Sequence, residues 1–396
     1  MVVIFVLAPL AGLVLLSSYL TLYNLAIGLF GLPARRQPAP AAPRPLLAIV
    51  PAHNEERVVA GVVRSLAASR YPRDELIIMV LCDHCTDDTA GEAMRAGADM
   101  LHVRSAGQGG KQHAIRDVLE DLGGTGRLGG FAGVLVVDAD NLVHPDLVAR
   151  LNDHLAAGAW AVQAALDTRN PDTGWVPRSY AAAYWVANLM VQRSRARLGL
   201  SAQLGGTGMA IATSTLRRVP FRPQTLVDDL EYTLQLILAG GRVDYCECPV
   251  YDEKPQTLAA SIRQRTRWMR GQAATIRQYA GPLLRHAVRR RSLVAADQWL
   301  MLWNPVAMAV TCAYFLAVLP LIGWAGIAWW LAWNGAINLA FVWRAGVPRQ
   351  LWRNVLPGLF YSFTWIVPVA WGFATHRHTG WTHTEHVGAG MAAPGL

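Results

Sequence analysis

The chain has 396 residues, 53% of them hydrophobic, with a mean hydropathy of +0.23 and a formal charge of +9. Because soluble domains rarely average above zero in hydropathy, this composition excludes an entirely soluble protein and predicts that part of the chain lies in lipid. The positive charge, carried almost wholly by arginine, suits anionic lipid, a polyphosphate ligand or nucleic acid, and the apolar segments below favour the first two.

The N-terminal segment is predicted to be a retained transmembrane anchor, residues 1–32. Residues 2–32 carry no charge and are long enough to span a ~30 Å hydrocarbon core, and a cleaved signal peptide would need a basic start. Arg35 and Arg36 follow directly, so the positive-inside rule places the N-terminus outside and the next domain in the cytoplasm. Residues 33–45, rich in Pro and Ala, are predicted to form a semi-rigid linker.

Residues 46–255 alternate short apolar runs with amphipathic helical patterns, which is typical of an α/β domain. Strands are expected at residues 46–50, 76–82, 100–103 and 134–137, and helices at 54–69, 87–96 and from Lys111 onward. This alternation predicts a doubly wound sheet whose ligand lies beyond the carboxyl ends of the strands. Polar clusters follow the strands at those ends.

Asp138 and Asp140 are the sharpest chemical signal, because both follow an apolar strand and lie two residues apart. Two such carboxylates can reach one hard divalent cation, and Mg²⁺ or Mn²⁺ prefers oxygen ligands that include phosphate. Without this context, paired acids are more often surface or capping residues. We therefore predict a Mg²⁺ or Mn²⁺ site that neutralises a departing diphosphate.

Four other polar positions follow or precede predicted elements. Asn54 could cap the helix after the first strand, and Asp83 ends the second strand, where it can accept hydrogen bonds from a base or ribose. Lys111 directly follows a glycine-rich loop and could bind a phosphate, although a simple turn explains the loop equally well. Asp229 precedes an apolar helical stretch, so it is either a helix N-terminal acid or a general base for an acceptor hydroxyl.

Residues 256–296 are predicted to form amphipathic helix crowded with arginine, of the kind that lies on an anionic leaflet. Within it, Gln264, Arg267 and Trp268 are spaced i, i+3 and i+4 and therefore share a helix face. An amide, a guanidinium and an indole together suit a diphosphate and a sugar ring. The alternative is a purely interfacial Arg/Trp helix.

Three further transmembrane helices are expected within residues 297–376, at about 299–321, 324–342 and 356–374. The arginines between the last two, Arg344, Arg349 and Arg353, place that loop inside and the tail, residues 377–396, outside. The sequence thus predicts a multi-pass protein of the cell (plasma) membrane with a cytoplasmic catalytic domain.

Five cysteines, an odd number without disulfide-like spacing, indicate a reducing compartment. Two pairs, Cys82 with Cys85 and Cys246 with Cys248, leave open a four-thiolate zinc site, but buried small side chains are the simpler interpretation.

Seven motifs, in order along residues 46–275, resemble those of family 2 glycosyltransferases, particularly the synthases of cellulose, chitin, hyaluronan and poly-N-acetylglucosamine. They are PAHNEE (51–56), CDHCTDDT (82–89), GGKQHA (109–114), VVDADN (136–141), GGTGMA (205–210), VDDLEY (227–232) and QRTRW (264–268). Two positions depart from the family pattern: His84 stands where Asn or Ser is usual, and Asp228 where Glu is usual.

The resemblance implies a GT-A fold, an α/β nucleotide-diphosphate-sugar-binding domain, joined to transmembrane helices. It implies that Ala52, Glu55 and Asp83 hold the nucleoside with Lys111 nearby, that Asp138 contacts the nucleotide, and that Asp140 binds the metal. It further implies that Asp229 is the catalytic base, that Gln264 and Arg267 contact the diphosphate, and that Gly206, Thr207, Gly208 and Trp268 face the acceptor.

The function expected from these residues is inverting transfer from a nucleotide diphosphate-sugar, with a UDP-sugar as the expected donor, to a growing β-linked glycan. The partners are then the donor, a glycan or lipid-linked acceptor and the bilayer. Two alternatives stay open: one transfer to a polyprenyl phosphate or other lipid, and an inactive membrane scaffold or transporter subunit.

Overall fold

The computed structural model describes residues 2–344, 352–353 and 355–377. Its contacts divide the chain into two compact units, and each is described separately below. Unit 1 comprises the described residues of Met1–Ala34, Pro171–Leu198 and Lys254–Gly380, and unit 2 comprises Arg35–Asn170 and Gly199–Glu253. The segment 171–198, which the sequence interpretation placed inside the α/β domain, thus belongs to the helical unit.

Unit 2 is built on one eight-stranded sheet with the order β3-β2-β1-β4-β7-β6-β8-β5. Its strands are β1 Leu46–Ala52, β2 Leu76–Asp83, β3 Met100–Arg104, β4 Gly133–Val136, β5 Leu142–Val143, β6 Ala161–Thr168, β7 Met209–Ala212 and β8 Val243–Asp252. Its helices are α2 Val59–Ala67, α3 Thr89–Arg95, α4 Lys111–Gly124, α5 Leu147–Ala156, α8 Thr213–Arg218 and α9 Asp228–Leu238.

The first four strands pair in parallel, as the alternating pattern predicted, but the sheet as a whole is mixed. β7 pairs antiparallel with both β4 and β6, and β5 pairs antiparallel with β8. The parallel, doubly wound arrangement expected from the sequence thus covers β1 to β4, and the remaining strands make the sheet mixed. Strand direction beyond that point depends on which distant strands pair, which local hydrophobic pattern does not encode.

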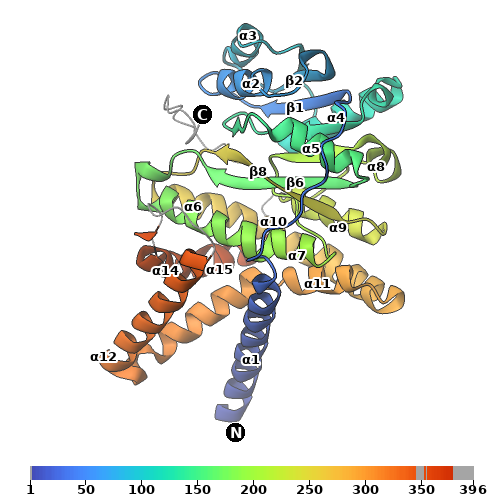
Figure 1. Cartoon of the computed structure of the whole chain (residues 1–396). Helices are drawn as coiled ribbons and strands as arrows, with labels where there is room; N and C mark the ends of the chain where they lie inside the picture. Colours follow the sequence, from blue (N-terminus) through green and yellow to red (C-terminus); the bar gives the residue numbers. More distant parts are fainter. Residues whose placement is uncertain (1, 345–351, 354, 378–396) are drawn as a thin grey trace. The chain divides into compact units, whose positions relative to one another are not determined.

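The core of unit 2 lies on both faces of the parallel strands. Alternate residues of β1, among them Ala48 and Val50, share one buried cluster with α2, α3 and α5. Leu47 and Ile49 are also fully buried but lie outside that cluster, and α4 packs against β1 and β2. Figure 1 shows α2 and α3 on one side of these strands and α4 on the other.

Two predicted features of this unit differ in detail. The helix expected from residue 54 begins only at Val59, because Asn54 adopts a left-handed conformation, with φ of 55°, and does not cap it. The expected linker is bound to the domain: Arg35 pairs with Asp244 at 2.7 Å, and the backbone N–H of Ala41 donates to Asp153. Polar side chains of α5 and β8 thus fix residues 35–44 against unit 2.

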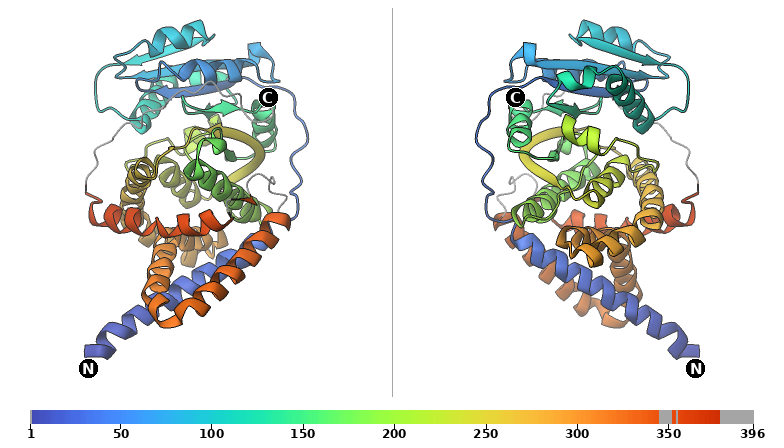
Figure 2. Two further views of the ribbon diagram at one scale, coloured as in Figure 1. Left: turned by 90° about the vertical axis from the view of Figure 1, so that its left-hand side faces the viewer. Right: turned by 90° about the vertical axis from the view of Figure 1, so that its right-hand side faces the viewer.

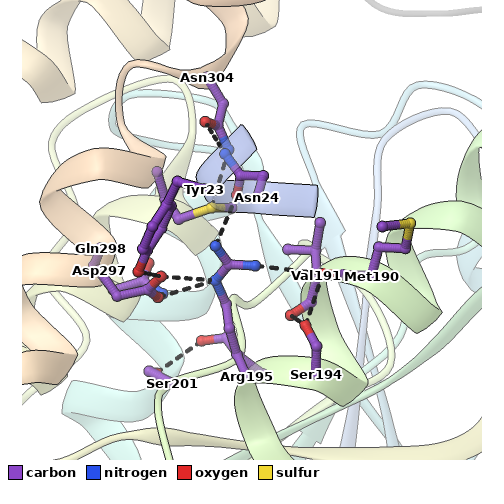
Figure 3. Close-up of polar contacts among 12 residues, drawn as sticks. Tyr23, Asn24, Met190, Val191, Ser194, Arg195, Ser201, Asp297, Gln298 and Asn304 are labelled. Carbon is purple, nitrogen blue, oxygen red and sulfur yellow. Dashed lines mark hydrogen bonds and ion pairs between the residues drawn. The ribbon is translucent and has the colours of Figure 1, made fainter. Parts of the chain in front are cut away.

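Unit 1 is helical: α1 Val2–Leu29, α6 Trp175–Ala187, α7 Ser194–Arg197, α10 Leu258–Arg290, α11 Leu293–Met301, α12 Asn304–Arg344, α14 Val355–Phe363 and α15 Ile366–Ala374. α1 packs along α12, as Figure 2 shows with α1 in blue and α12 in orange, and α10 packs against α11 and α15. Thr257 caps α10 by accepting from the Ala260 N–H. Buried polar contacts also join α1, α7, α11 and α12 (Figure 3).

The expected C-terminal spans are interrupted in this unit. The segment predicted at 356–374 is two nine-residue helices, separated at Thr364 and Trp365, because Pro368 lacks the N–H that would bond back to residue 364. The segment predicted at 299–321 starts within α11, and α12 breaks at Gly323, with φ of 60°. Arg349 and residues 378–396 lie outside the described residues.

In the described part of the chain, no helix taken singly has the length and apolar character needed to cross a membrane. α11 and residues 304–320 of α12 meet that criterion together, although the pair bends by 42°.

Candidate active site

The carboxyl ends of β1 and β2 are joined by side-chain contacts. Asn54 lies two residues beyond β1 and His84 lies one residue beyond β2. Both have a positive φ, 55° for Asn54 and 53° for His84. The Asn54 side chain accepts from the Thr86 N–H at 2.7 Å, and His53 Nδ1 lies 2.6 Å from the Asp83 carbonyl. Non-glycine residues in this conformation are uncommon and concentrate at functional sites. The segments that follow β1 and β2 are therefore held together by hydrogen bonds in one arrangement.

Asp83 is nearly fully buried at the end of β2, and the protein satisfies both of its oxygens. One oxygen accepts from the Gly110 N–H at 2.7 Å, and the other accepts from Arg104 at 2.7 Å and His84 at 2.8 Å. Burial alone would raise the pKa of Asp83, but the hydrogen bonds from Gly110, His84 and Arg104 outweigh it and lower that pKa. Asp83 therefore anchors the loop that starts α4.

Lys111, the first residue of α4, joins three segments of the site. Its Nζ contacts the Asp138 carboxylate and donates to the Gly206 carbonyl at 2.6 Å. Burial would lower the pKa of Lys111, but Asp138, Asp228 and Asp229 together raise it. The ammonium group is thus charged and surrounded by carboxylates that come from distant parts of the sequence.

The glycine-rich loop at 205–208 is held from two sides. Thr207 Oγ1 accepts from the Asp138 N–H at 3.1 Å and from the Asn141 amide at 2.5 Å. Gln163 accepts from the Gly205 N–H at 2.7 Å and donates to the Thr207 carbonyl at 2.9 Å. Gln163 was missed in the sequence, although one amide inside the apolar run AVQAAL of β6 was a usable signal.

Gly206 brings this loop against Asp229. Its φ is +82°, and a Cβ added there would lie 3.2 Å from Asp229 Oδ2 and 3.7 Å from Lys111 Nζ. A side chain at this position would be strained and would crowd the carboxylate. Glycine therefore permits close approach of the backbone to the acidic centre.

Asp228 and Asp229 begin α9. Burial and then repulsion by Asp228 raise the pKa of Asp229 to about 7, while the Leu230 N–H and Lys111 oppose this rise. Burial also raises the pKa of Asp228, whose Oδ2 is buried without a hydrogen-bond partner. A carboxylate that titrates near neutrality can act as a general base at that pH. A raised pKa is compatible with the base role that the family resemblance implies for Asp229, and that role stays a prediction.

Glu55 adds a third acid beside Asp138 and Asp140. Burial, followed by repulsion from Asp140 and Asp138, raises the pKa of Glu55 to about 9. In residues 2–344, 352–353 and 355–377, no group of three or more His, Cys, Asp or Glu side chains is arranged to hold a metal ion. Two carboxylates completed by diphosphate oxygens would still suit Mg²⁺, which usually keeps substrate phosphates in its shell.

The QRTRW motif lies on α10, in unit 1, where Tyr180 of α6 links two of its residues. The Tyr180 hydroxyl donates to Gln264 Oε1 at 3.2 Å and is 3.0 Å from Ser261 Oγ. Its ring meets Trp268 edge to face, with centroids 6.5 Å apart. The Lys254 ammonium lies 4.6–5.9 Å from the rings of Tyr184, Tyr180 and Trp268.

Arg265, inside the same motif, is fully buried. Its guanidinium lies 4.6 Å from the Tyr361 ring centroid and 4.9 Å from that of Trp365, and it donates to Thr364 Oγ1 at 2.9 Å. It therefore ties α10 to the break between α14 and α15. No feature of the sequence distinguished Arg265 from its more exposed neighbours Arg263, Arg267 and Arg270.

The strand order of the sheet rules out the four-thiolate zinc site that the two cysteine pairs had left open. Cys82 and Cys85 lie at the end of β2, whereas Cys246 and Cys248 lie on β8, and four strands separate β2 from β8. Four thiolates around one zinc must each lie ~2.3 Å from the metal. The two pairs cannot meet that requirement.

A sheet with parallel strands, an acidic centre at their carboxyl ends and a glycine loop with positive φ at Gly206 and Gly208 agrees with an α/β fold of the GT-A type. Residues 43–271, more than half of the chain, match the family described as "Glycosyltransferase like family 2". The chain belongs to this glycosyltransferase family.

Two relatives and a solved structure illustrate how much of this chain is similar to known proteins. A "Beta-monoglucosyldiacylglycerol synthase" of Synechocystis sp. is 30% identical over 231 residues, covering 56% of this chain and 47% of that protein, so the match spans about half of that relative. A protein of the same name from Trichormus variabilis is 23% identical and covers 95% of this chain and 83% of that protein. The structure titled "Mannosyltransferase PcManGT from Pyrobaculum calidifontis in complex with GDP-Man and Mn2+" shares the fold, with 19% identity, a TM-score of 0.59 and coverage of 91% of this chain and 99% of that one.

Proposed function

We propose that the protein is an inverting, metal-dependent glycosyltransferase that moves a sugar from a nucleotide diphosphate-sugar to a neutral hydroxyl of a membrane lipid. The observation that carries this proposal is the position of Asp229, whose carboxylate lies beside Gly206 and within the electrostatic influence of Lys111. It gives a carboxylate of pKa about 7, next to a backbone that a ligand can approach closely.

The reaction follows as a single displacement. Asp229 accepts the proton of the acceptor hydroxyl, whose oxygen attacks the anomeric carbon as the bond to the diphosphate oxygen breaks on the opposite side. An α-linked donor then gives a β-linked product. A neutral hydroxyl needs such a base, whereas a lipid phosphate is already anionic.

Asp138 and Asp140 would hold Mg²⁺ or Mn²⁺. Repulsion from Asp140 and Asp138 raises the pKa of Glu55, and Asp138 also contributes to the raised pKa of Asp229, so a divalent ion bound here would relieve a repulsion that the acids of the site exert on one another. The ion would neutralise charge that develops on the departing nucleoside diphosphate. We assign nucleoside binding to Ala52, Glu55 and Asp83, and diphosphate binding to Gln264 and Arg267, on the family resemblance.

The lipid acceptor is favoured by the two relatives named β-monoglucosyldiacylglycerol synthases. It also agrees with unit 1, whose helices expose many large apolar side chains. Among these are Leu15 of α1, Trp324, Trp329 and Trp343 of α12, and Trp371 of α15. We therefore propose that unit 1 lies in the cell membrane and that unit 2 works on its cytoplasmic side.

A second candidate is the growth of a β-linked glycan. The specific observation for it is Trp268, whose indole is held by Tyr180 beside Gln264. An indole suits stacking on a sugar acceptor, and on the family resemblance we also assign Gly206, Thr207 and Gly208 to the acceptor.

The deciding experiment offers the full chain, in nanodiscs with Mn²⁺, a panel of UDP- and GDP-sugars with diacylglycerol, polyprenyl phosphate or β-linked oligosaccharides. We expect nucleoside diphosphate release with one donor and diacylglycerol, giving one organic-soluble β-glycoside. A ladder of aqueous products would favour the glycan. Transfer only to polyprenyl phosphate would refute the neutral-hydroxyl acceptor, and turnover by Asp229→Asn would refute the assigned base.

A further inference from the structure

The C-terminal end of α10 presents a surface that no step of the proposed reaction uses. On the exposed side of this helix, and at the turn into α11, arginines alternate with large apolar side chains. We call this surface the α10 end patch, and it consists of Leu284, Arg285, Val288, Arg289, Arg290, Arg291 and Leu293. The opposite side of the same helix is buried through Ile276, Tyr279, Leu283 and Ala287.

The apolar side chains of the α10 end patch are more exposed than is usual for apolar side chains on a helix that faces water. Val288 is 70% exposed and Leu293 is 77% exposed. Leu284 and Val288 are four residues apart, as are Arg285 and Arg289, so both kinds of side chain lie along one strip of the helix. The arginines of such a strip suit the headgroup layer of a bilayer, and its apolar side chains suit the boundary with the acyl chains.

The charge of the patch is uncompensated locally. Residues 254–296 contain nine arginines, one lysine and no aspartate or glutamate. The next acid along the chain, Asp297, is buried in an ion pair with Arg195 and so does not offset the patch. Arg291, with φ of 51°, ends the helix and adds one more cation at the turn into α11.

From this surface we infer that the α10 end patch binds anionic phospholipid headgroups and recruits them around unit 1. Its arginines meet the lipid phosphates, while Leu284, Val288 and Leu293 enter the acyl boundary. The inference is independent of which acceptor receives the sugar. It commits to an anionic leaflet rather than nucleic acid, because nucleic acid offers nothing to the exposed leucines and valine.

The test uses the full chain in nanodiscs made from equal parts of phosphatidylcholine and phosphatidylglycerol. Native mass spectrometry then measures the ratio of the two lipids that the released protein retains. Each arginine at an anionic surface favours it by roughly fivefold, so wild-type protein should retain phosphatidylglycerol in clear excess. The triple variant Arg285→Gln, Arg289→Gln, Arg290→Gln should bring the ratio to within about twofold of that in the nanodisc.

A matched control removes three exposed arginines of unit 2: Arg64→Gln, Arg127→Gln and Arg217→Gln. This variant should keep the wild-type lipid ratio. An apolar variant, Leu284→Ser with Val288→Ser and Leu293→Ser, should weaken retention without any change in charge.

Retention of phosphatidylglycerol by the patch triple variant at the wild-type ratio would overturn the inference. So would an equal loss in the unit 2 control, since net charge alone would then explain it. A third contrary result is binding of a single-stranded 20-nucleotide probe, in phosphatidylcholine nanodiscs, that the patch triple variant abolishes while lipid retention is unchanged.

Discussion

Arg195 and Asp297 form an ion pair in which neither side chain is exposed beyond 1%, with Nε 2.9 Å from one carboxylate oxygen and 3.2 Å from the other. Arg195 lies on α7 and Asp297 on α11. Tyr23 of α1 donates to Asp297 at 2.8 Å, and Arg195 donates to Asn24, which in turn donates to Asn304 of α12 (Figure 3). One buried charge pair therefore joins four helices of unit 1.

Removing one member of this pair should destabilise unit 1 strongly. We expect Asp297→Asn to cost about 3–5 kcal/mol, because it leaves the Arg195 guanidinium buried without its counter-charge. The double variant Arg195→Met, Asp297→Leu should recover much of that loss. Thermal unfolding in detergent measures both. Arg70→Gln, which breaks the exposed pair with Asp146, is the control and should cost less than about 1 kcal/mol; an equal effect there would contradict the assignment.

Asp229→Asn should separate binding from chemistry. A general base contributes ~10²–10⁴ in rate, so turnover should fall by that factor while nucleoside diphosphate affinity, measured by calorimetry, stays within a few-fold. The wild-type rate should rise with pH around an apparent pKa of about 7, and the variant should lack this limb. Because the folded pKa lies above the unfolded value, the ionised form of Asp229 destabilises the fold as pH rises from about 4 to 7.

The same substitution should therefore stabilise the protein at pH 8 by roughly 1–4 kcal/mol and have little effect below pH 4, since one pKa unit is worth about 1.4 kcal/mol. An active variant, or one destabilised at pH 8, would make Asp229 an ordinary helix-start acid.

Lys111→Met should move the pH profile of turnover upward. Lys111 holds down the pKa of Asp229, and without it only the Leu230 N–H, of the groups named above, opposes the repulsion that Asp228 and Asp138 exert on the ionised base. Loss of a neighbouring opposite charge shifts a carboxyl pKa by about 1–3 units, so the apparent pKa should rise by at least about 1. Lys111→Arg keeps the charge and should keep the wild-type profile. An unchanged profile in the Met variant, with nucleotide binding intact, would remove Lys111 from the electrostatics of the base.

Chelation should abolish turnover, and Mn²⁺ or Mg²⁺ should restore it. Asp140→Asn should raise the metal concentration for half-maximal rate by at least about tenfold, since a coordinating carboxylate is replaced by a weaker neutral ligand. The readout is nucleoside diphosphate release over a metal titration. Full activity in excess EDTA would exclude the metal from the reaction. Asp146→Asn, which changes a half-buried acid outside the site, is the control.

Tyr180→Phe should loosen Gln264 without removing the ring that packs on Trp268. The lost hydroxyl donates to Gln264 and contacts Ser261, and a net hydrogen bond is worth about 0.5–1.5 kcal/mol. We expect a KM increase of about 2- to 12-fold with kcat little changed. Tyr361→Phe also loses a contact with Ser261 but leaves Gln264 alone, so it should change KM less. Equal effects would make Tyr180 a packing residue only.

Local patterns in the sequence determined the four parallel strands and the residues at their ends. Apolar runs bounded by polar clusters identified β1, β2, β3 and β4 within one or two residues at each end, because a buried parallel strand is hydrophobic on both faces. The acids at 138, 140 and 229 and the glycines at 206 and 208 were identifiable from their positions, because each lies close to the beginning or the end of a predicted element.

Only the tertiary structure decided what those residues contact. The antiparallel pairing of β7 with β4, the support of the glycine loop by Gln163 and the position of Lys111 between Asp138 and Gly206 join segments 27 to 95 residues apart. The buried pair of Arg195 and Asp297, 102 residues apart, is a further instance, since in the sequence both are ordinary surface-type residues. A periodic pattern reports which face of an element is buried, but the partner buried against it is chosen by packing over the whole chain.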